Sequence, residues 1–211
     1  MPDGAAWPAA ADGVLRGLAH ELSNRTGTIA AVAEALAAER PDSRLATALS
    51  SEAERLQELL RLLRLLSTDA TRPAEPVRPA DVLDDALALF ALHPGGRAAS
   101  AQLAGALDEA PPVRARVPAL TRALLVLLAA VADGGGPVGV CATSDDAWLV
   151  LRVAGEGVPP DEADWADAVA EARALVAADG GEVARSADGE GVELRLPTLV
   201  ALRRAERERI G

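Results

Sequence analysis

A histidine, an acidic residue and an amide lie close together in the segment Leu18-Ala19-His20-Glu21-Leu22-Ser23-Asn24. An unperturbed imidazole has a pKa of about 6.5, so most of it is neutral near pH 7. A neutral ring nitrogen can attack phosphorus without the help of a strong base. Asn24 follows His20 by one helical turn and would share its face of a helix. His20 is therefore the candidate nucleophile of this chain.

Two amphipathic helices are expected to position this segment. Apolar residues recur at intervals of three, four and seven from Asp12 to about residue 40, a turn follows at Pro41 and Asp42, and a second helix is expected over 43–67. The first stripe consists of Leu15, Leu18, Leu22, Ile29, Ala33 and Leu36, and the second of Leu49, Leu56 and Leu63, interleaved with Leu59 and Leu66. Because the first stripe is centred roughly opposite His20, the imidazole is expected to project away from the core of its helix.

The second helix is too apolar to be covered by one partner helix. Leu60, Leu62 and Leu65 widen its apolar surface beyond the leucine stripe. A second copy of the chain could cover it, which predicts a homodimer with a four-helix bundle. The alternative is that the C-terminal part of the same chain covers this surface.

The pattern of elements divides the chain into four parts. Residues 1–11 are expected to be a flexible N-terminus, 12–68 the helical hairpin, 69–80 a linker with prolines at 73, 76 and 79, and 81–211 a second domain. In the second domain we expect helices at 80–92, 118–132 and 162–178, and strands near 137–143, 147–154 and 182–196. This order predicts an α+β protein whose second domain is an α/β two-layer sandwich.

The segment around His20 resembles the H-box of histidine kinases, commonly written His-Glu-Leu-x-Asn-Pro. The resemblance implies that Glu21 holds or accepts the proton of the second ring nitrogen, and that Asn24 orients the phosphoryl group or its acceptor. Arg25 stands in place of the usual proline, which normally bends the helix. The loss of that proline implies a stiffer bundle.

The second domain resembles the ATP-binding domain of the same family, without its ligand residues. Val126 and Ala130 stand where the family has magnesium-binding asparagines, and Val153 stands where it has the aspartate that accepts the adenine amino group. The segment that would form the phosphate-covering lid is missing. Apolar side chains offer no oxygen to a hard cation, so we expect neither bound ATP nor a metal or other cofactor.

Together these resemblances imply a dimeric histidine phosphotransferase. It would carry a phosphoryl group through His20 between aspartates of response-regulator receiver domains or a hybrid kinase, and Mg²⁺ would come with the receiver domain. Three alternatives stay open: a pseudokinase scaffold that docks such partners, a divergent ATP-dependent histidine kinase, and a helical interaction protein in which His20 is incidental.

Composition excludes several other classes of function. The net charge is −11, which opposes binding to nucleic acid, and no residue is a lysine. A single cysteine, Cys141, permits no intrachain disulfide and no cysteine metal cluster, which favours the cytoplasm. Neither an export signal nor a membrane anchor is expected, because the apolar stretch from Ala119 to Ala132 is too short to span a bilayer.

Overall fold

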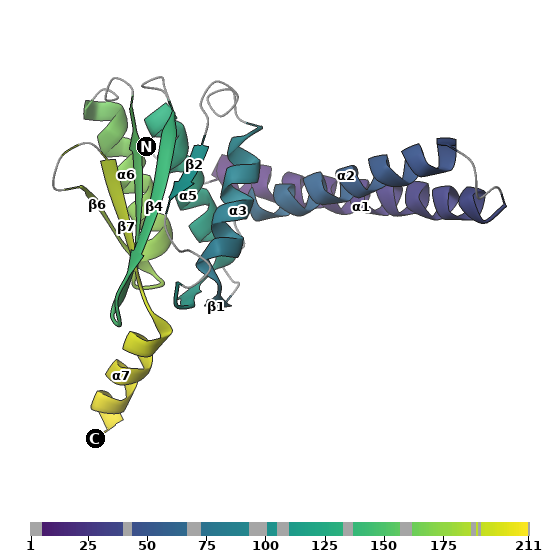
Figure 1. Cartoon of the computed structure of the whole chain (residues 1–211). Helices are drawn as coiled ribbons and strands as arrows, with labels where there is room; N and C mark the ends of the chain where they lie inside the picture. The colour runs from purple at the N-terminus through teal and green to yellow at the C-terminus, as the bar shows by residue number, and fades with distance from the viewer. Residues whose placement is uncertain are drawn as a thin grey trace. The chain divides into compact units, whose positions relative to one another are not determined.

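The computed structural model describes residues 6–39, 44–66, 73–92, 101–104, 110–132, 137–156, 162–186, 189 and 191–210. The chain forms two compact units, which divide between Asp69 and Ala70. The first is a helical hairpin and the second an α/β sandwich (Figure 1). The structure thus has the α+β class that the sequence predicts.

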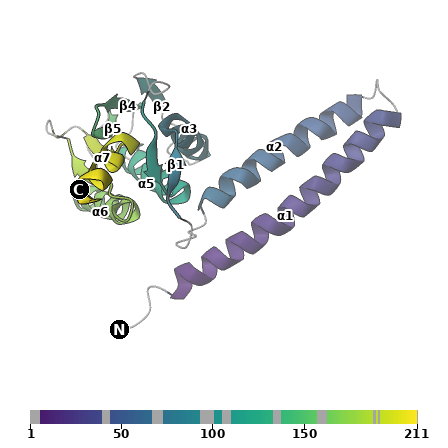
Figure 2. The same cartoon turned by 90° about the horizontal axis from the view of Figure 1, so that it is seen from below.

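The hairpin consists of α1 (Ala6–Glu39) and α2 (Arg44–Leu66), which run antiparallel (Figure 2). Helix α1 begins at Ala6, so residues 6–11 of the expected flexible N-terminus are helical. Residues Ala9 to Ala11 are good helix formers and allow the helix to begin before Asp12.

Mostly small residues form the contact between the two helices. Ala19, Thr26 and Ala33 are buried at seven-residue intervals on α1, and Ala46, Ala53 and Leu60 are buried at the same interval on α2. Intervals of seven keep one side of each helix facing its partner along the whole hairpin. We call these six residues the hairpin seam.

The leucine stripes expected to form this contact lie beside it instead. Leu22 and Ile29 on α1 are 39% and 41% exposed, and Leu45 and Leu59 on α2 are 63% and 45% exposed. Of the expected first stripe, Ala33 belongs to the seam. The sequence-based expectation was wrong here because it favoured bulky residues, whereas alanines let two helices approach closely.

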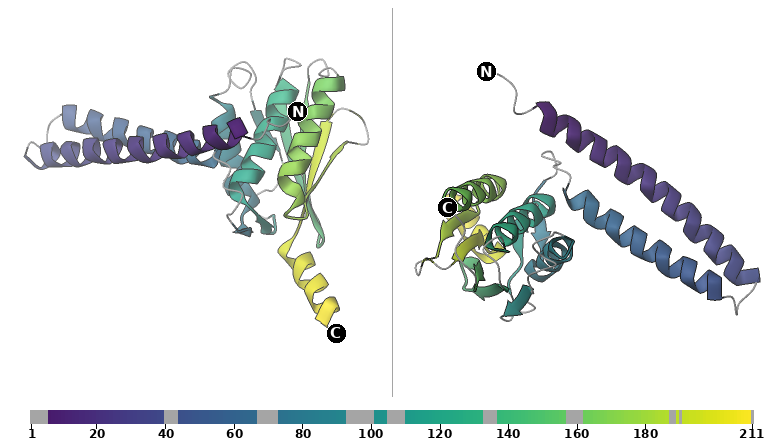
Figure 3. Two further views of the ribbon diagram at one scale, coloured as in Figure 1. Left: turned by 180° about the vertical axis from the view of Figure 1, so that it is seen from behind. Right: turned by 90° about the horizontal axis from the view of Figure 1, so that it is seen from above.

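The sandwich contains a five-stranded sheet in the order β2-β4-β5-β7-β6. Its strands are β2 (Ala101–Ala104), β4 (Val138–Ser144), β5 (Trp148–Gly155), β6 (Glu182–Arg185) and β7 (Gly191–Pro197). Strands β2 and β4 are parallel, and every other pairing is antiparallel. Helices α3 (Pro79–Phe90), α5 (Val117–Ala132) and α6 (Glu162–Ala177) cover one face of the sheet (Figures 2 and 3).

The alternation of side chains along β5 shows why one face is covered. Leu149, Leu151 and Val153 are buried under the helices, while the residues between them are partly exposed on the other face. Leucines of α5 complete this core, among them Leu124, Leu127 and Leu128, each 0% exposed. The sandwich therefore closes its own core.

Three short elements differ from the sequence-based expectation. Part of the expected linker forms β1 (Glu75–Val77), which pairs with β3 (Val113–Ala115), and α3 begins inside the linker at Pro79. Proline suits the first turn of a helix because its missing N–H would have no partner there. Strands β1, β2 and β3 have three or four residues each, too few for a periodicity to be recognised.

The last helix, α7 (Leu199–Ile210), extends away from the sandwich (Figure 1). Thr198 begins it: its hydroxyl accepts a hydrogen bond from the Ala201 N–H at 3.1 Å and donates one to the Asp146 carbonyl at 2.6 Å. The helix is exposed from Arg203 to Arg209, as a solvated, charged helix would be.

Candidate functional site

The predicted site residues lie in the middle of the long helix α1. Ala19 is buried in the hairpin seam and Asn24 is exposed. The backbone at His20 and Glu21 is helical, and the side chains of both lie outside the described residues. At about 100° per residue, position 20 is turned by roughly 100° from the seam residue Ala19. His20 therefore occupies the flank of the hairpin, with Asn24 one turn further on.

The exposed apolar residues occupy the other flank. On α1, Leu22 is turned from Ala19 by roughly −60°, and on α2, Leu59 is turned from Leu60 by roughly −100°. The two helices are antiparallel, so angles of the same sign, measured on each helix from its seam residue along its own chain direction, point to the same side of the hairpin. Leu22, Ile29, Leu45 and Leu59 thus share one side, which we call the apolar side, and position 20 belongs to the opposite side.

A hydrogen bond between described residues crosses the hairpin next to the candidate nucleophile. The Nη2 of Arg64, in the last turn of α2, donates to the Oγ of Ser23 at 2.8 Å. Ser23 follows His20 by three positions, so its side chain lies on the same face of α1. The sequence-based reasoning did not find Arg64, because no local pattern on α2 indicates which residue of α1 it reaches.

Two further arginines of α2 bond to glutamates of the same helix. Arg61 donates to both carboxylate oxygens of Glu58, at 2.9 and 2.7 Å, and Arg55 donates to Glu52 at 3.5 Å. The hydrogen bonds and charge of Arg61 hold the pKa of Glu58 below its usual range.

Two threonines follow the site along α1. The Thr26 hydroxyl donates to the Leu22 carbonyl at 2.8 Å, and the Thr28 hydroxyl donates to the Asn24 carbonyl at 3.0 Å. Gly27 lies between them, and a Cβ added there would meet no atom within 4 Å. Hydroxyls that bond to the carbonyl four residues earlier weaken and bend helices, and an exposed helical glycine costs about 1 kcal/mol relative to alanine. Thr26, Gly27 and Thr28 should therefore lower the stability of α1 just after the site, next to position 25, which lacks the expected proline.

In the sandwich, the positions singled out by the sequence are apolar and packed. Val153 is 0% exposed in the core, while Val126 and Ala130 are partly buried on α5. The end of β5 lies directly against α5, because a Cβ added to Gly155 would lie 2.6 Å from the Cγ1 of Val131. Among the residues that the structure describes, no group of three His, Cys, Asp or Glu side chains could hold a metal ion.

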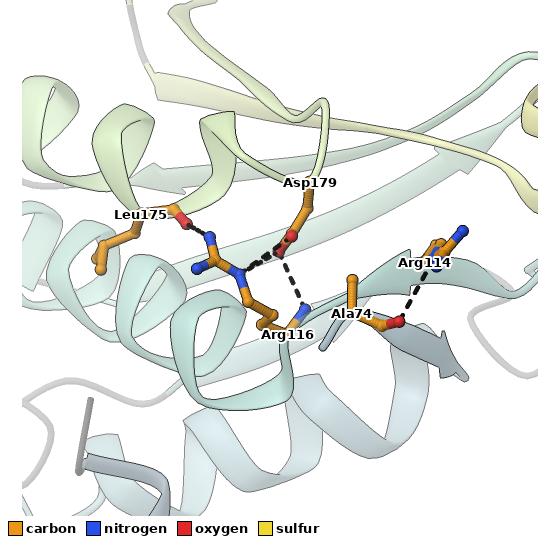
Figure 4. A network of polar contacts seen from close by, with 5 residues as sticks. All are labelled: Ala74, Arg114, Arg116, Leu175 and Asp179. Carbon is orange, nitrogen blue, oxygen red and sulfur yellow. Dashed lines mark hydrogen bonds and ion pairs between the residues drawn. The ribbon is translucent and has the colours of Figure 1, made fainter. Parts of the chain in front are cut away.

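A polar network connects the start of α5 to the end of α6 (Figure 4). The backbone N–H of Arg116 donates to Oδ2 of Asp179 at 3.0 Å, and its Nε donates to Oδ1 at 3.1 Å. Its Nη2 donates to the Leu175 carbonyl at 3.2 Å, at the end of α6. Asp179 has a side chain only 4% exposed, so this ion pair is largely protected from water. Its partners are distant in sequence and its role is structural.

No helix in the described ranges is long and apolar enough to be a membrane span.

Comparison with known proteins gives likenesses of fold only. No family model matches the chain, and no curated protein sequence matches it. Similar solved structures include full-length ShkA, crystallised in complex with AMPPNP, at 20% identity and a TM-score of 0.46 over 88% of this chain. The chain covers only 45% of ShkA.

Two further structures are similar. The histidine kinase AdeS of Acinetobacter baumannii has 19% identity and a TM-score of 0.48, over 85% of this chain and 96% of AdeS. The ATP binding domain of PrrB from Mycobacterium tuberculosis has 22% identity and a TM-score of 0.47, over 59% of this chain and 97% of that domain. Because these three TM-scores are below 0.5, the chemistry of the site is inferred from the chain's own residues.

Proposed function

We propose that this chain is a histidine phosphotransferase that works through His20 and does not hydrolyse ATP. A ring nitrogen of His20 attacks the phosphorus of a receiver-domain aspartyl phosphate. The bond from phosphorus to the carboxylate oxygen breaks, the aspartate leaves as its carboxylate, and a nitrogen–phosphorus bond forms, while the proton on the second ring nitrogen stays there, held by Glu21. In the second half of the cycle the carboxylate of another receiver attacks phosphorus, and the imidazole is regenerated.

The proposal that the chain does not use ATP rests on apolar side chains at three positions of the sandwich. Val126, Ala130 and Val153 occupy the positions where the resemblance calls for magnesium and adenine ligands. Their side chains have no oxygen or nitrogen, and Val153 is completely buried in a packed core. A hard cation and the amino group of adenine would each lose hydrogen bonds or ligands there, at about 1–3 kcal/mol for each unsatisfied group.

The hairpin supports the role of His20 as an accessible carrier. Position 20 lies on the side opposite Leu22 and Ile29, and Asn24, one turn on, is exposed. A receiver domain can approach this side without disturbing the hairpin seam. Glu21 would hold the proton on the second ring nitrogen and Asn24 would orient the phosphoryl group, while the receiver domain would supply Mg²⁺.

The apolar side supports a homodimer. Four apolar side chains that are 39–63% exposed lie along one side of a two-helix unit, and a second hairpin would bury them in a four-helix bundle. Such a bundle leaves position 20 of each protomer outside the interface. Dimerisation and phosphotransfer would therefore use opposite sides of the hairpin.

A labelling experiment tests the proposal. The purified chain is incubated with Mg²⁺ and ATP labelled on its γ-phosphate, and separately with labelled phosphorylated receiver domains; the same is done with His20→Ala. We expect label from a receiver and not from ATP, and we expect none in His20→Ala. Label taken directly from ATP would establish the divergent kinase instead.

A docking measurement separates the scaffold from the phosphotransferase. If no receiver of a broad panel transfers label, but receivers bind the wild type and His20→Ala equally, the chain is a scaffold. Asn24→Ala is the intermediate variant: for a phosphotransferase we expect slower transfer with retained docking, because an orienting hydrogen bond is lost while the surface stays intact.

A further inference from the structure

Helix α7 is anchored at its base and exposed along the rest of its length (Figures 1 and 3). The buried Thr198 begins the helix, and its N–H donates to the Ala147 carbonyl at 3.0 Å. The N–H of Leu199 donates to the Pro112 carbonyl at 3.1 Å, so segments next to both sheets hold the first turn. From residue 203 to 209 every side chain is exposed. The last two turns of the helix are therefore open to contact.

One face of α7 is basic. Four arginines and two glutamates give the helix a net charge of +2, in a chain whose net charge is −11. At about 100° per residue, three of the arginines lie within roughly 60° of Val200, and Arg209 lies on the opposite side. Both glutamates lie further round, at roughly 80° and 120° from Val200. The basic face of α7 consists of Val200, Arg203, Arg204 and Arg207.

The arginines of the basic face have few acidic partners within the described part of the chain. Arg204 pairs with Asp146 at 3.9 Å, with both side chains more than 60% exposed, and so exposed a pair contributes little. Among the described residues, neither Arg203 nor Arg207 takes part in a side-chain hydrogen bond or ion pair. Val200, between them on this face, is 50% exposed. Two guanidinium groups beside an exposed valine can therefore bind carboxylates of another molecule.

We propose that the basic face of α7 docks an acidic surface of the receiver domain. This inference rests on the proposed function, because it takes the receiver as the partner. A receiver that carries an aspartyl phosphate and holds Mg²⁺ needs clustered carboxylates, since hard cations prefer oxygen ligands. A guanidinium fork matches a carboxylate with two parallel hydrogen bonds, and a positive face speeds the encounter with an acidic partner.

The charge of the whole chain favours a protein partner over a larger polyanion. A nucleic acid duplex or an anionic membrane extends beyond one helix of about 18 Å, and would also meet the rest of a chain of net charge −11. A helix that lies in a membrane surface needs a broad apolar face. Among the described side chains of α7, Val200 is the only large apolar one that is exposed. A compact acidic protein surface, by contrast, can contact α7 alone.

Matched charge reversals test the docking. Fluorescently labelled receiver domains are titrated with the full-length wild type and each variant, and the Kd is measured by fluorescence anisotropy at several NaCl concentrations. Arg207→Glu should raise the Kd about tenfold and flatten its dependence on salt, because an attractive charge becomes repulsive. Arg209→Glu changes the net charge equally but on the opposite side of α7, and should alter the Kd less than about twofold. Val200→Ser should raise the Kd about threefold at every salt concentration, because an apolar contact is lost.

The outcomes separate this inference from the proposed function. Equal Kd values for Arg207→Glu and Arg209→Glu, or no receiver binding to the wild type, would overturn docking by α7. So would a DNA duplex or phosphatidylserine vesicles that bind more tightly than every receiver and lose binding in Arg207→Glu. Transfer of label from receivers to His20 with the same KM in the wild type and Arg207→Glu would retain the phosphotransferase and refute the docking helix. Docking that is lost in Arg207→Glu, together with no label on His20 in the wild type, would retain the docking helix and make the chain a scaffold.

Discussion

The hairpin and the sandwich bury apolar surface in opposite ways. In the sandwich, bulky side chains such as Leu124 and Leu151 are at most 1% exposed, and small residues occupy tight places such as Gly155. In the hairpin, four alanines, one threonine and one leucine form the buried seam, while Ile29 and Leu59 are more than 40% exposed. The sandwich is complete within one chain, whereas the hairpin leaves apolar surface for a partner. The two units should therefore respond differently to equivalent substitutions.

The largest difference is expected for leucine truncation. Leu151→Ala, in the central strand β5, removes methyl groups from a packed core and should lower the free energy of unfolding of the sandwich by about 3 kcal/mol. Leu45→Ala on α2, where the side chain is 63% exposed, should change it by less than about 0.5 kcal/mol in the monomer. Denaturant unfolding measures the loss for Leu151→Ala. It is followed by tryptophan fluorescence with Trp7 of α1 replaced by phenylalanine, so that only Trp148 and Trp165 of the sandwich report. Equal losses in the free energy of unfolding for Leu151→Ala and Leu45→Ala would contradict the contrast between the packed sandwich and the open hairpin.

A smaller difference is expected between the two kinds of ion pair. Asp179→Asn replaces a carboxylate, 4% exposed, that accepts hydrogen bonds from Arg116, and should cost about 2 kcal/mol because a cation is left poorly paired. Glu58→Gln breaks the pair with Arg61 on the hairpin, where both side chains are about half exposed, and should cost at most about 0.5 kcal/mol. Chemical denaturation of both variants, followed by circular dichroism for the hairpin, measures the two losses in the free energy of unfolding. A larger loss for Asp179→Asn would show that burial controls the strength of the ion pair.

The apolar side of the hairpin can be tested by adding hydroxyl groups to it. Ile29→Ser and Leu59→Ser should each weaken self-association by about 1 kcal/mol, because partly exposed apolar groups lose their burial in the bundle. Val200→Ser on α7, where the side chain is 50% exposed, is the control and should leave the dimer unchanged. Sedimentation equilibrium at several concentrations gives the dissociation constants. A monomeric wild type would mean that something other than a second copy covers this side.

Sequence patterns located most of the helices and the longer strands, because those elements have enough residues for a period of 3.6 or 2 to emerge. Helix α5 and strand β5 begin and end within a residue or two of the expected ranges. The patterns did not locate the seam. A count of apolar residues ranks Leu22 above Ala19, whereas the approach of two helices depends on small size.

The candidate site was only partly accessible to the same reasoning. His20 and Asn24 were selected by residue type, by their spacing along one helix and by the resemblance of their segment to the H-box. Arg64 could not be selected, because its bond to Ser23 depends on the register between two helices. That register depends on how the two helices pack along the seam, which the periodicity of either helix alone does not reveal.

The smallest expected effect concerns Gly27, which lies between Thr26 and Thr28 on α1. Gly27→Ala places a methyl group in open space and should stabilise the hairpin by about 0.5–1 kcal/mol, since alanine restricts the unfolded chain. Ala31→Gly, one turn later at an exposed position, should have the opposite effect of similar size. Hydrogen exchange of the amides from Ser23 to Ala31 should slow in the first variant and accelerate in the second. If Gly27→Ala leaves exchange unchanged while Ala31→Gly accelerates it, then α1 is already rigid at Gly27, and the hydroxyls of Thr26 and Thr28 reinforce the helix without bending it.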